Sequence, residues 1–269
     1  MAIMRVTFSS EVLCRYIDFN VIVPMETPGL PGAEEKESAI KKTEKKFKTL
    51  YLLHGYSGNQ DDWLTYSNIR ALADQYGIAV VMPAGENSFY VDGCAAGTHW
   101  GEMVGKELVE FTRRMFPLSP KREDTFIGGL SMGGFGALRL GSYYCETFGK
   151  IFSLSGAFIV DNIADKEEGY SDVVGDYIYY RHTFGDLKEI KNSPKDPLWC
   201  AKQAANSDYR IQMYIACGDQ DFLIKENRSA KKQLEKLGIS LKYVETPGIH
   251  DWKFWNEHLE PAIYWLLND

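Results

Sequence analysis

Short, continuously apolar runs alternate with stretches of helical periodicity along most of this 269-residue chain. The apolar runs cover residues 49–53, 78–82, 125–128, 151–154, 211–216 and 241–244. The helical stretches cover residues 69–73, 105–115, 136–143, 229–237 and 261–267. A strand without polar alternation is covered on both faces, and strands that alternate with helices form parallel sheets. The pattern therefore predicts an α/β fold with a mostly parallel central sheet and helices on both faces.

Three segments depart from this alternation. Residues 4–9 and 16–23 alternate more between apolar and polar side chains, which predicts an antiparallel hairpin at the sheet edge. Residues 24–48 begin with prolines and glycines and continue dense in Glu and Lys, which predicts a charged surface excursion. Residues 157–208 are too long for a simple crossover and rich in tyrosine, which predicts a cap insertion over a pocket. We expect one domain over residues 1–269.

The charge balance argues against nucleic acid as a partner. The net charge is −7 and the pI is about 5.4, whereas a surface that follows phosphates needs clustered Lys and Arg. No apolar run reaches the ~20 residues of a membrane span, and the first residues lack the pattern of a signal peptide. The five cysteines are scattered without a C-x-x-C pair, so we expect neither a disulfide framework nor a metal site. These features predict a cytoplasmic protein.

A G-x-S-x-G pattern, GLSMG, stands at residues 129–133. It follows an apolar strand and precedes a helical stretch, which is the strand–turn–helix setting of a nucleophile elbow. Gly129 and Gly133 let strand and helix approach closely, and the tight turn pushes the Ser131 side chain out at the top of the sheet. We therefore predict an α/β-hydrolase fold with Ser131 as nucleophile, in preference to an idle serine in a glycine-rich turn.

A serine hydroxyl needs a base, and in this fold the chain order is serine, acid, histidine. Three histidines follow Ser131 in the sequence. His250 comes shortly after the last predicted strand, where a loop at the carboxyl end of the sheet would present it. His182 lies inside the expected cap and precedes the acid, and His258 is expected to be exposed on the last helix. The sequence therefore predicts His250 as the base.

Two carboxylates follow the predicted strand at 211–216, in the sequence CGDQD at 217–221. Acids in this fold commonly stand in a G-x-x-D turn, which favours Asp221. Asp219 is then expected to stabilise the turn, as Asp side chains do by bonding nearby backbone N–H groups. Asp219 remains the alternative acid at this point.

The tetrahedral intermediate of acyl transfer needs two hydrogen-bond donors aimed at its oxyanion. The N–H of Met132, directly after the nucleophile, is one predicted donor. The second comes from the glycine-rich loop at 54–58, from the N–H of Tyr56 or Gly55, with His54 expected to hold that loop. Gly55 and Trp100 are the expected substrate contacts. A purely structural role for Trp100 as a buried aromatic is the alternative.

Four segments together resemble the esterase D family: LLHG at 52–55, GLSMGG at 129–134, CGDQDFL at 217–223 and HDW at 250–252. That family includes S-formylglutathione hydrolases, bacterial tributyrin esterases, some feruloyl esterases and the mycolyltransferases of the antigen 85 group. The chain looks most like the tributyrin esterases, which share the His-x-Trp-x-x-Trp ending seen at His250, Trp252 and Trp255. The resemblance runs in order from about residue 5 to residue 267.

This resemblance implies a Ser131–Asp221–His250 triad and an oxyanion hole at Tyr56 and Met132. The predicted function is that of a serine carboxylesterase acting on small-molecule, short-chain acyl esters, with no metal or cofactor. The alternatives are a feruloyl or acetyl esterase for plant-derived esters, or an S-formylglutathione hydrolase. A catalytically inactive binding module on the same scaffold is the remote alternative. The sequence leaves homo-oligomer formation open.

Overall fold

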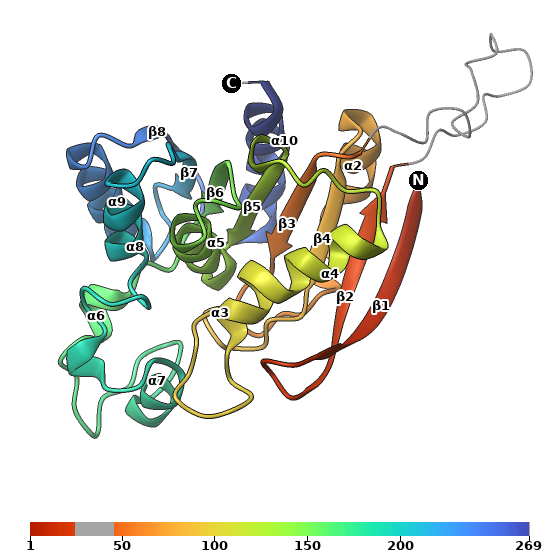
Figure 1. The fold of residues 1–269 in the computed structure, drawn as a ribbon. Helices are drawn as coiled ribbons and strands as arrows, with labels where there is room; N and C mark the ends of the chain where they lie inside the picture. Colours follow the sequence, from red (N-terminus) through yellow and green to blue (C-terminus); the bar gives the residue numbers. More distant parts are fainter. Residues whose placement is uncertain (25–45, 269) are drawn as a thin grey trace, which may run out of the picture.

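The structure is a computed structural model, and it describes residues 1–24 and 46–268. One eight-stranded sheet runs through these residues in the order β1-β2-β4-β3-β5-β6-β7-β8 (Figure 1). The strands are β1 (Ala2–Ser10), β2 (Arg15–Val23), β3 (Thr49–Leu53), β4 (Ala79–Pro83), β5 (Thr125–Leu130), β6 (Lys150–Leu154), β7 (Gln212–Gly218) and β8 (Ser240–Thr246). Strands β3 to β8 are parallel to one another, whereas β2 is antiparallel to both of its neighbours, β1 and β4.

Helices cover both faces of this sheet. They are α1 (Asp62–Tyr66), α2 (Ile69–Tyr76), α3 (Trp100–Glu102), α4 (Leu108–Met115), α5 (Met132–Tyr143), α6 (Val160–Ile163), α7 (Tyr177–Phe184), α8 (Pro197–Ala205), α9 (Ile224–Lys236) and α10 (Trp252–Asn268). A π-helical turn at Met103–Glu107 precedes α4, and short 3₁₀ turns lie at Arg122–Asp124 and Leu187–Glu189.

Two apolar clusters fill the space between sheet and helices. Tyr51 and Leu53 of β3 face the cluster that contains α4, α5, α8 and α9, whereas Leu50 and Leu52 face the cluster of α2 and α10. Successive side chains of a strand point to opposite faces, so a strand with helices on both sides is apolar throughout. All five residues of β3 are buried. The predicted α/β class, with a mostly parallel sheet covered on both faces, is confirmed.

The predicted hairpin is also confirmed at the sheet edge. β1 pairs with β2 in an antiparallel register from Ala2↔Val23 to Ser10↔Arg15. Along most of β1, half-buried and exposed residues alternate, because one of its faces meets water. The predicted excursion at 24–48 lies almost entirely outside the described residues. No helix within the described ranges has the length and apolar character needed to cross a membrane.

The last helix differs from its prediction. The apolar pattern placed it at 261–267, but α10 begins at Trp252, and Pro261 lies inside it. His258 was expected to be exposed, and this prediction is wrong: the side chain is buried and its Nε2 lies 2.9 Å from the Thr246 hydroxyl. The reason is the position of α10, which packs against the sheet along its length, so that a polar residue on its inner face becomes buried.

Candidate active site

Ser131 occupies a strained turn between β5 and α5. Its backbone has φ 53° and ψ −117°, a conformation that a residue with a side chain adopts only at a cost. A Cβ added at Gly129 would lie 2.6 Å from the backbone of Gly133, so the strand and the helix could not meet as closely with larger residues. The close approach predicted for these two glycines is present, and it presents Ser131 beyond the end of β5.

Ser131, His250 and Asp221 form one chain of hydrogen bonds. The Ser131 Oγ lies 3.0 Å from Nε2 of His250. Nδ1 of the same ring lies 2.9 Å and 3.0 Å from the two carboxylate oxygens of Asp221. When Nδ1 carries the ring proton and donates a hydrogen bond to Asp221, Nε2 has its lone pair free to accept the proton of the Ser131 hydroxyl. The structure therefore brings together the three residues predicted as nucleophile, base and acid.

Asp221 and Asp219 differ in their partners, although both follow β7. Asp221 is buried and also accepts a hydrogen bond from the N–H of Leu223 at 2.8 Å. Burial would raise the pKa of Asp221, but hydrogen bonding from His250 and the positive charge available there outweigh it and hold this pKa below its usual value. Asp219 instead accepts from the N–H of Gly248 at 3.3 Å and holds the turn before His250. Only Asp221 contacts the imidazole among these two carboxylates.

The predicted oxyanion donors lie next to Ser131. Met132 is the first residue of α5, and the first N–H groups of a helix have no partner inside it. Across from it, a Cβ added at Gly55 would come within 3.6 Å of the Ser131 Cβ, so the backbone of this loop passes directly beside the nucleophile. Tyr56 follows in the same loop. The assignment of the two donors remains a prediction.

His54 holds the loop that carries Gly55. Its Nδ1 donates to the Gly55 carbonyl at 2.7 Å, and its Nε2 accepts from the N–H of Gly85 at 2.9 Å. Burial lowers the pKa of His54, which keeps the ring neutral and preserves this pair of bonds. The Tyr90 hydroxyl adds a bond to the His54 carbonyl at 3.0 Å. Both ring nitrogens are thus occupied by backbone groups, as expected for a histidine that supports the loop.

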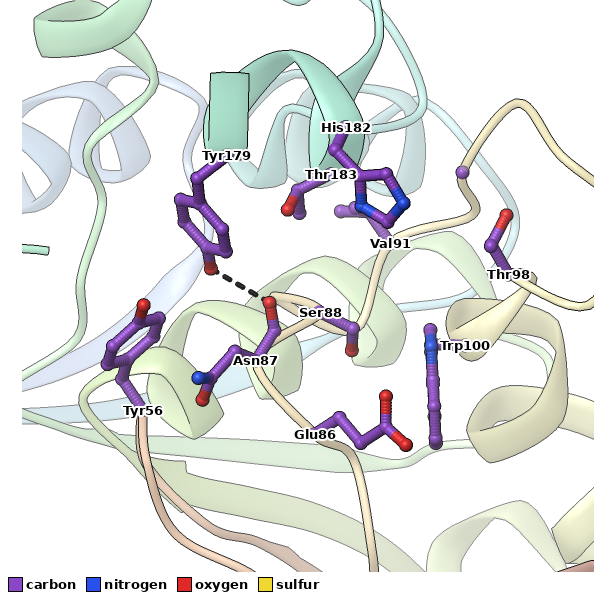
Figure 2. A pocket seen from close by; sticks show the side chains of 11 residues that line it. Tyr56, Glu86, Asn87, Ser88, Val91, Thr98, Trp100, Tyr179, His182 and Thr183 are labelled. Atoms are coloured by element: carbon purple, nitrogen blue, oxygen red, sulfur yellow. Dashed lines mark hydrogen bonds between the residues drawn. The ribbon is translucent and has the colours of Figure 1, made fainter. Parts of the chain in front are cut away.

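A cavity of about 290 Å³ is lined in part by Tyr56 of the same loop (Figure 2). We call it the Tyr56 cavity. It is lined by Tyr56, Glu86, Asn87, Ser88, Val91, Gly93, Thr98, Trp100, Tyr179, His182 and Thr183. Trp100 is buried and forms one wall, whereas neither Gly55 nor Ser131 lines this cavity. The role of Trp100 and Gly55 as substrate contacts remains a prediction.

Helix α7 supplies Tyr179, His182 and Thr183 to the wall of the Tyr56 cavity. The Tyr179 hydroxyl donates to the carbonyl of Asn87 at 2.8 Å, and its ring meets that of Tyr56 edge to face at 5.7 Å. Figure 2 shows both tyrosines on the same side of the cavity. Residues 86–88 were missed in the sequence. Their position could have indicated them, because they follow β4 at the carboxyl end of the sheet, where ligands bind in such folds.

The exposed side of His250 is covered by an aromatic ring. Phe222 lies with its ring centroid 4.5 Å from that of His250, although 59% of its own surface is exposed. Among the described residues, no group of three His, Cys, Asp or Glu side chains is placed to hold a metal ion. The chemistry that the site offers is that of a serine nucleophile, a base and a buried carboxylate.

Comparison with known proteins gives consistent results over nearly the whole chain. The Esterase family model matches residues 37–266. An acetyl esterase of Caldicellulosiruptor saccharolyticus is 43% identical over 269 residues, which cover 99% of this chain and 98% of the relative.

Two structures from Staphylococcus aureus are similar in fold. One is FphF, a fluorophosphonate-binding serine hydrolase, with a TM-score of 0.83 and 27% identity over 100% of this chain and 99% of that one. The other is the S-formylglutathione hydrolase FrmB, with a TM-score of 0.81 and 27% identity over 99% of both chains. The similarity therefore extends well beyond the segments around Ser131.

Proposed function

This chain belongs to the Esterase family of serine hydrolases with the α/β-hydrolase fold, and from that premise we propose that it hydrolyses short-chain acyl esters with Ser131 as nucleophile. The observation that carries this proposal is the continuous hydrogen-bond chain from Ser131 through His250 to Asp221. A serine in a strained turn, with an imidazole nitrogen at 3.0 Å and a buried carboxylate behind that ring, has the arrangement that acyl transfer requires.

The reaction proceeds in two acyl transfers. His250 Nε2 takes the proton from Ser131 as the hydroxyl oxygen attacks the ester carbonyl, and Asp221 stabilises the imidazolium that forms. The oxyanion accepts hydrogen bonds from the N–H groups of Met132 and Tyr56. His250 returns the proton to the leaving alcohol, which departs and leaves an acyl-enzyme. Water then attacks with His250 as base, and the acid is released.

Ser131 does not line the Tyr56 cavity, but Tyr56 stands in the loop that passes beside Ser131, and we propose that the acyl group enters this cavity. Its walls then support a preference for small acyl groups. Trp100 and two tyrosines narrow it, and its volume lies near the lower end of the range for ligand pockets. The acetyl esterase relative points to the same substrate class. We also propose that residues 157–208 act as a cap, because α7 supplies Tyr179, His182 and Thr183 to this cavity. We keep the cytoplasm as the expected compartment, since all five cysteines are free thiols.

A panel of p-nitrophenyl esters tests the chain-length preference. We expect kcat/KM to be highest for acetate and butyrate and to fall for octanoate, because rigid walls exclude long chains whereas each methylene that fits adds only about 1–3 kcal/mol. Faster cleavage of octanoate than of butyrate would contradict a narrow acyl site. Ser131→Ala is the control for non-enzymatic hydrolysis.

Two natural ester types belong in the same panel. The S-formylglutathione hydrolase relative makes that thioester a second candidate substrate, and turnover of S-formylglutathione well above that of p-nitrophenyl acetate would favour it. Methyl ferulate tests the feruloyl esterase alternative, since the aromatic walls could also stack on a hydroxycinnamoyl ring. Labelling of Ser131 by a fluorophosphonate probe separates all of these from an inactive binding module, which would not react.

A further inference from the structure

The two tryptophans of the His-x-Trp-x-x-Trp ending have no part in the reaction derived above. His250 is the base, but Trp252 and Trp255 do not contact Ser131 through any of the bonds described. Both tryptophans lie at the start of α10, directly after the loop that presents His250. Trp255 is buried, and its ring meets the imidazole of His250 at a right angle with centroids 5.0 Å apart. A side chain that packs on the base in this way restricts the orientation of the ring.

Trp255 also reaches the acid through Ser155. Its indole Nε1–H donates to the Ser155 Oγ at 3.1 Å. Ser155 directly follows β6, is fully buried and has φ 50°, in the left-handed region that residues with side chains seldom occupy. Its N–H donates to the carbonyl of Ala216 at 2.7 Å, next to the turn that carries Asp221. Because Oγ accepts from the indole, its own O–H is free to donate, and both the Asp221 carboxylate and the Cys217 sulfur lie where they can accept it.

We propose that Ser155 and Trp255 are positioning residues, which together hold Asp221 and His250 in the geometry that activates Ser131. The proposal rests on the proposed function of the triad. Ser155 and Trp255 would act on the reaction only through Asp221 and His250.

Each partner restricts a different motion of the site. The Ser155 hydroxyl and the Leu223 N–H fix the carboxylate of Asp221, and the pKa of Asp221 reflects stabilisation of its charged form by His250, Leu223 and Ser155 against the cost of burial. The Trp255 ring limits rotation of His250. A further titratable group faces Asp221 from β7, the Cys217 thiol, and burial raises its pKa so that it stays neutral.

Trp255→Phe is the first test, with Trp252→Phe as its matched control. Phenylalanine keeps an aromatic ring beside His250 but removes the Nε1–H that holds Ser155. Trp252 occupies the same helical turn and meets Trp255 edge to face at 5.2 Å, without a bond to Ser155. We expect kcat on p-nitrophenyl acetate to fall about fivefold in Trp255→Phe with KM unchanged. Trp252→Phe should retain the kcat of the wild type.

Ser155→Ala tests the bond to the carboxylate. Loss of a donor to a charged group should lower kcat by about 10- to 100-fold. Without the Ser155 hydrogen bond, the negative charge of Asp221 would stabilise the protonated form of His250 more strongly. The acidic limb of the profile of kcat/KM against pH should therefore move to higher pH. A purely structural defect would lower the active fraction without moving this limb. The kcat of the double variant Ser155→Ala/Trp255→Phe should be little lower than that of Ser155→Ala alone, because the indole of Trp255 acts through Ser155.

Three outcomes would overturn the proposal: an unchanged kcat in both Ser155→Ala and Trp255→Phe, an equal loss in Trp252→Phe, or additive losses with an unmoved acidic limb. Melting temperatures and fluorophosphonate titration of active sites normalise every variant to folded enzyme. A wild type that hydrolyses no ester, or an active Ser131→Ala, would instead contradict the proposed function, so the two failures are distinguishable.

Discussion

The carboxyl edge of the sheet and the segment at 157–208 meet around the same site but are built differently. At the sheet edge, the turn that carries each triad residue is bonded to neighbouring strand backbone. The N–H of Ser131 donates to the carbonyl of Leu154 at 2.9 Å, and the N–H of Asp219 donates to that of Thr246 at 2.9 Å. These bonds join β5 to β6 and β7 to β8 at the point where the chemistry takes place.

Within the 157–208 segment, residues 165–182 depend instead on a few side chains, because Tyr180 is the one buried residue among them. α6 and α7 lie below the sheet in Figure 1, apart from the helices that cover its faces. Tyr180 is buried and its hydroxyl bonds both carboxylate oxygens of Asp172 at 2.8 and 2.9 Å, within the segment itself. Val173 and Ile178 are 89% and 71% exposed. Segments with few buried contacts open and shift at low free energy. From this difference we expect the sheet edge to govern the reaction and the 157–208 segment to govern the choice of substrate.

The largest effect should come from removing the nucleophile or the base. Ser131→Ala and His250→Ala should each lower kcat by about 10⁶-fold, and the double variant should lose little more, because the residues act as one unit. Single-turnover kinetics with p-nitrophenyl acetate measures these losses. Additive losses of kcat in the double variant would show that Ser131 and His250 do not act as one catalytic unit.

The two carboxylates after β7 should differ strongly. Asp221→Asn should lower kcat by about 10⁴-fold, since an amide cannot hold the required tautomer or stabilise the imidazolium. Asp219→Asn, its matched control in the same turn, should lower kcat by less than about 10-fold, because Asp219 bonds only the Gly248 N–H. Steady-state kinetics of both variants decides the matter, and the reverse order would transfer the role of acid to Asp219.

Changes in α7 should alter selectivity more than turnover. Tyr179→Phe removes the hydroxyl bonded to the Asn87 carbonyl, and we expect kcat/KM to change about fivefold, mostly through KM. Tyr177→Phe in the same helix is the control, because Tyr177 does not line the Tyr56 cavity. The ratio of butyrate to octanoate cleavage is the readout. If Tyr179→Phe lowered kcat as much as Asp221→Asn does, the expected division of roles between the sheet edge and the 157–208 segment would be contradicted.

The smallest effect concerns acid stability of the 157–208 segment. Burial raises the pKa of Asp172, but hydrogen bonds from Val174, Gly175 and two tyrosines lower it below 3.8 overall. A carboxyl with a lowered pKa in the folded state contributes stability above its unfolded pKa and loses it as pH falls through the folded value. The melting-temperature difference between wild type and Asp172→Asn should therefore shrink below about pH 3.8. A difference that grows on acidification would contradict this assignment.

Much of the site could be predicted because its residues follow strands directly. Ser131, Asp221 and His250 each stand in a short turn whose place on the sheet is set by the strand before it. Chain order and local pattern were therefore enough to select Ser131 and His250 and to favour Asp221 over Asp219. The Tyr56 cavity was harder, because Glu86 and Asn87 meet Tyr179 only across a long stretch of chain. No local pattern links residues that far apart.

The sequence by itself determined the parallel sheet, the edge hairpin and the choice of Ser131 and His250, because periodicity and turn chemistry act over a few neighbouring residues. Only the tertiary structure decided which partners surround that triad. It buried His258 against Thr246, set Asp221 rather than Asp219 on His250, and joined Trp255 to Ser155. These contacts depend on how α10 packs against the ends of β6 and β7, and packing between distant elements is set by the whole core rather than by any one segment.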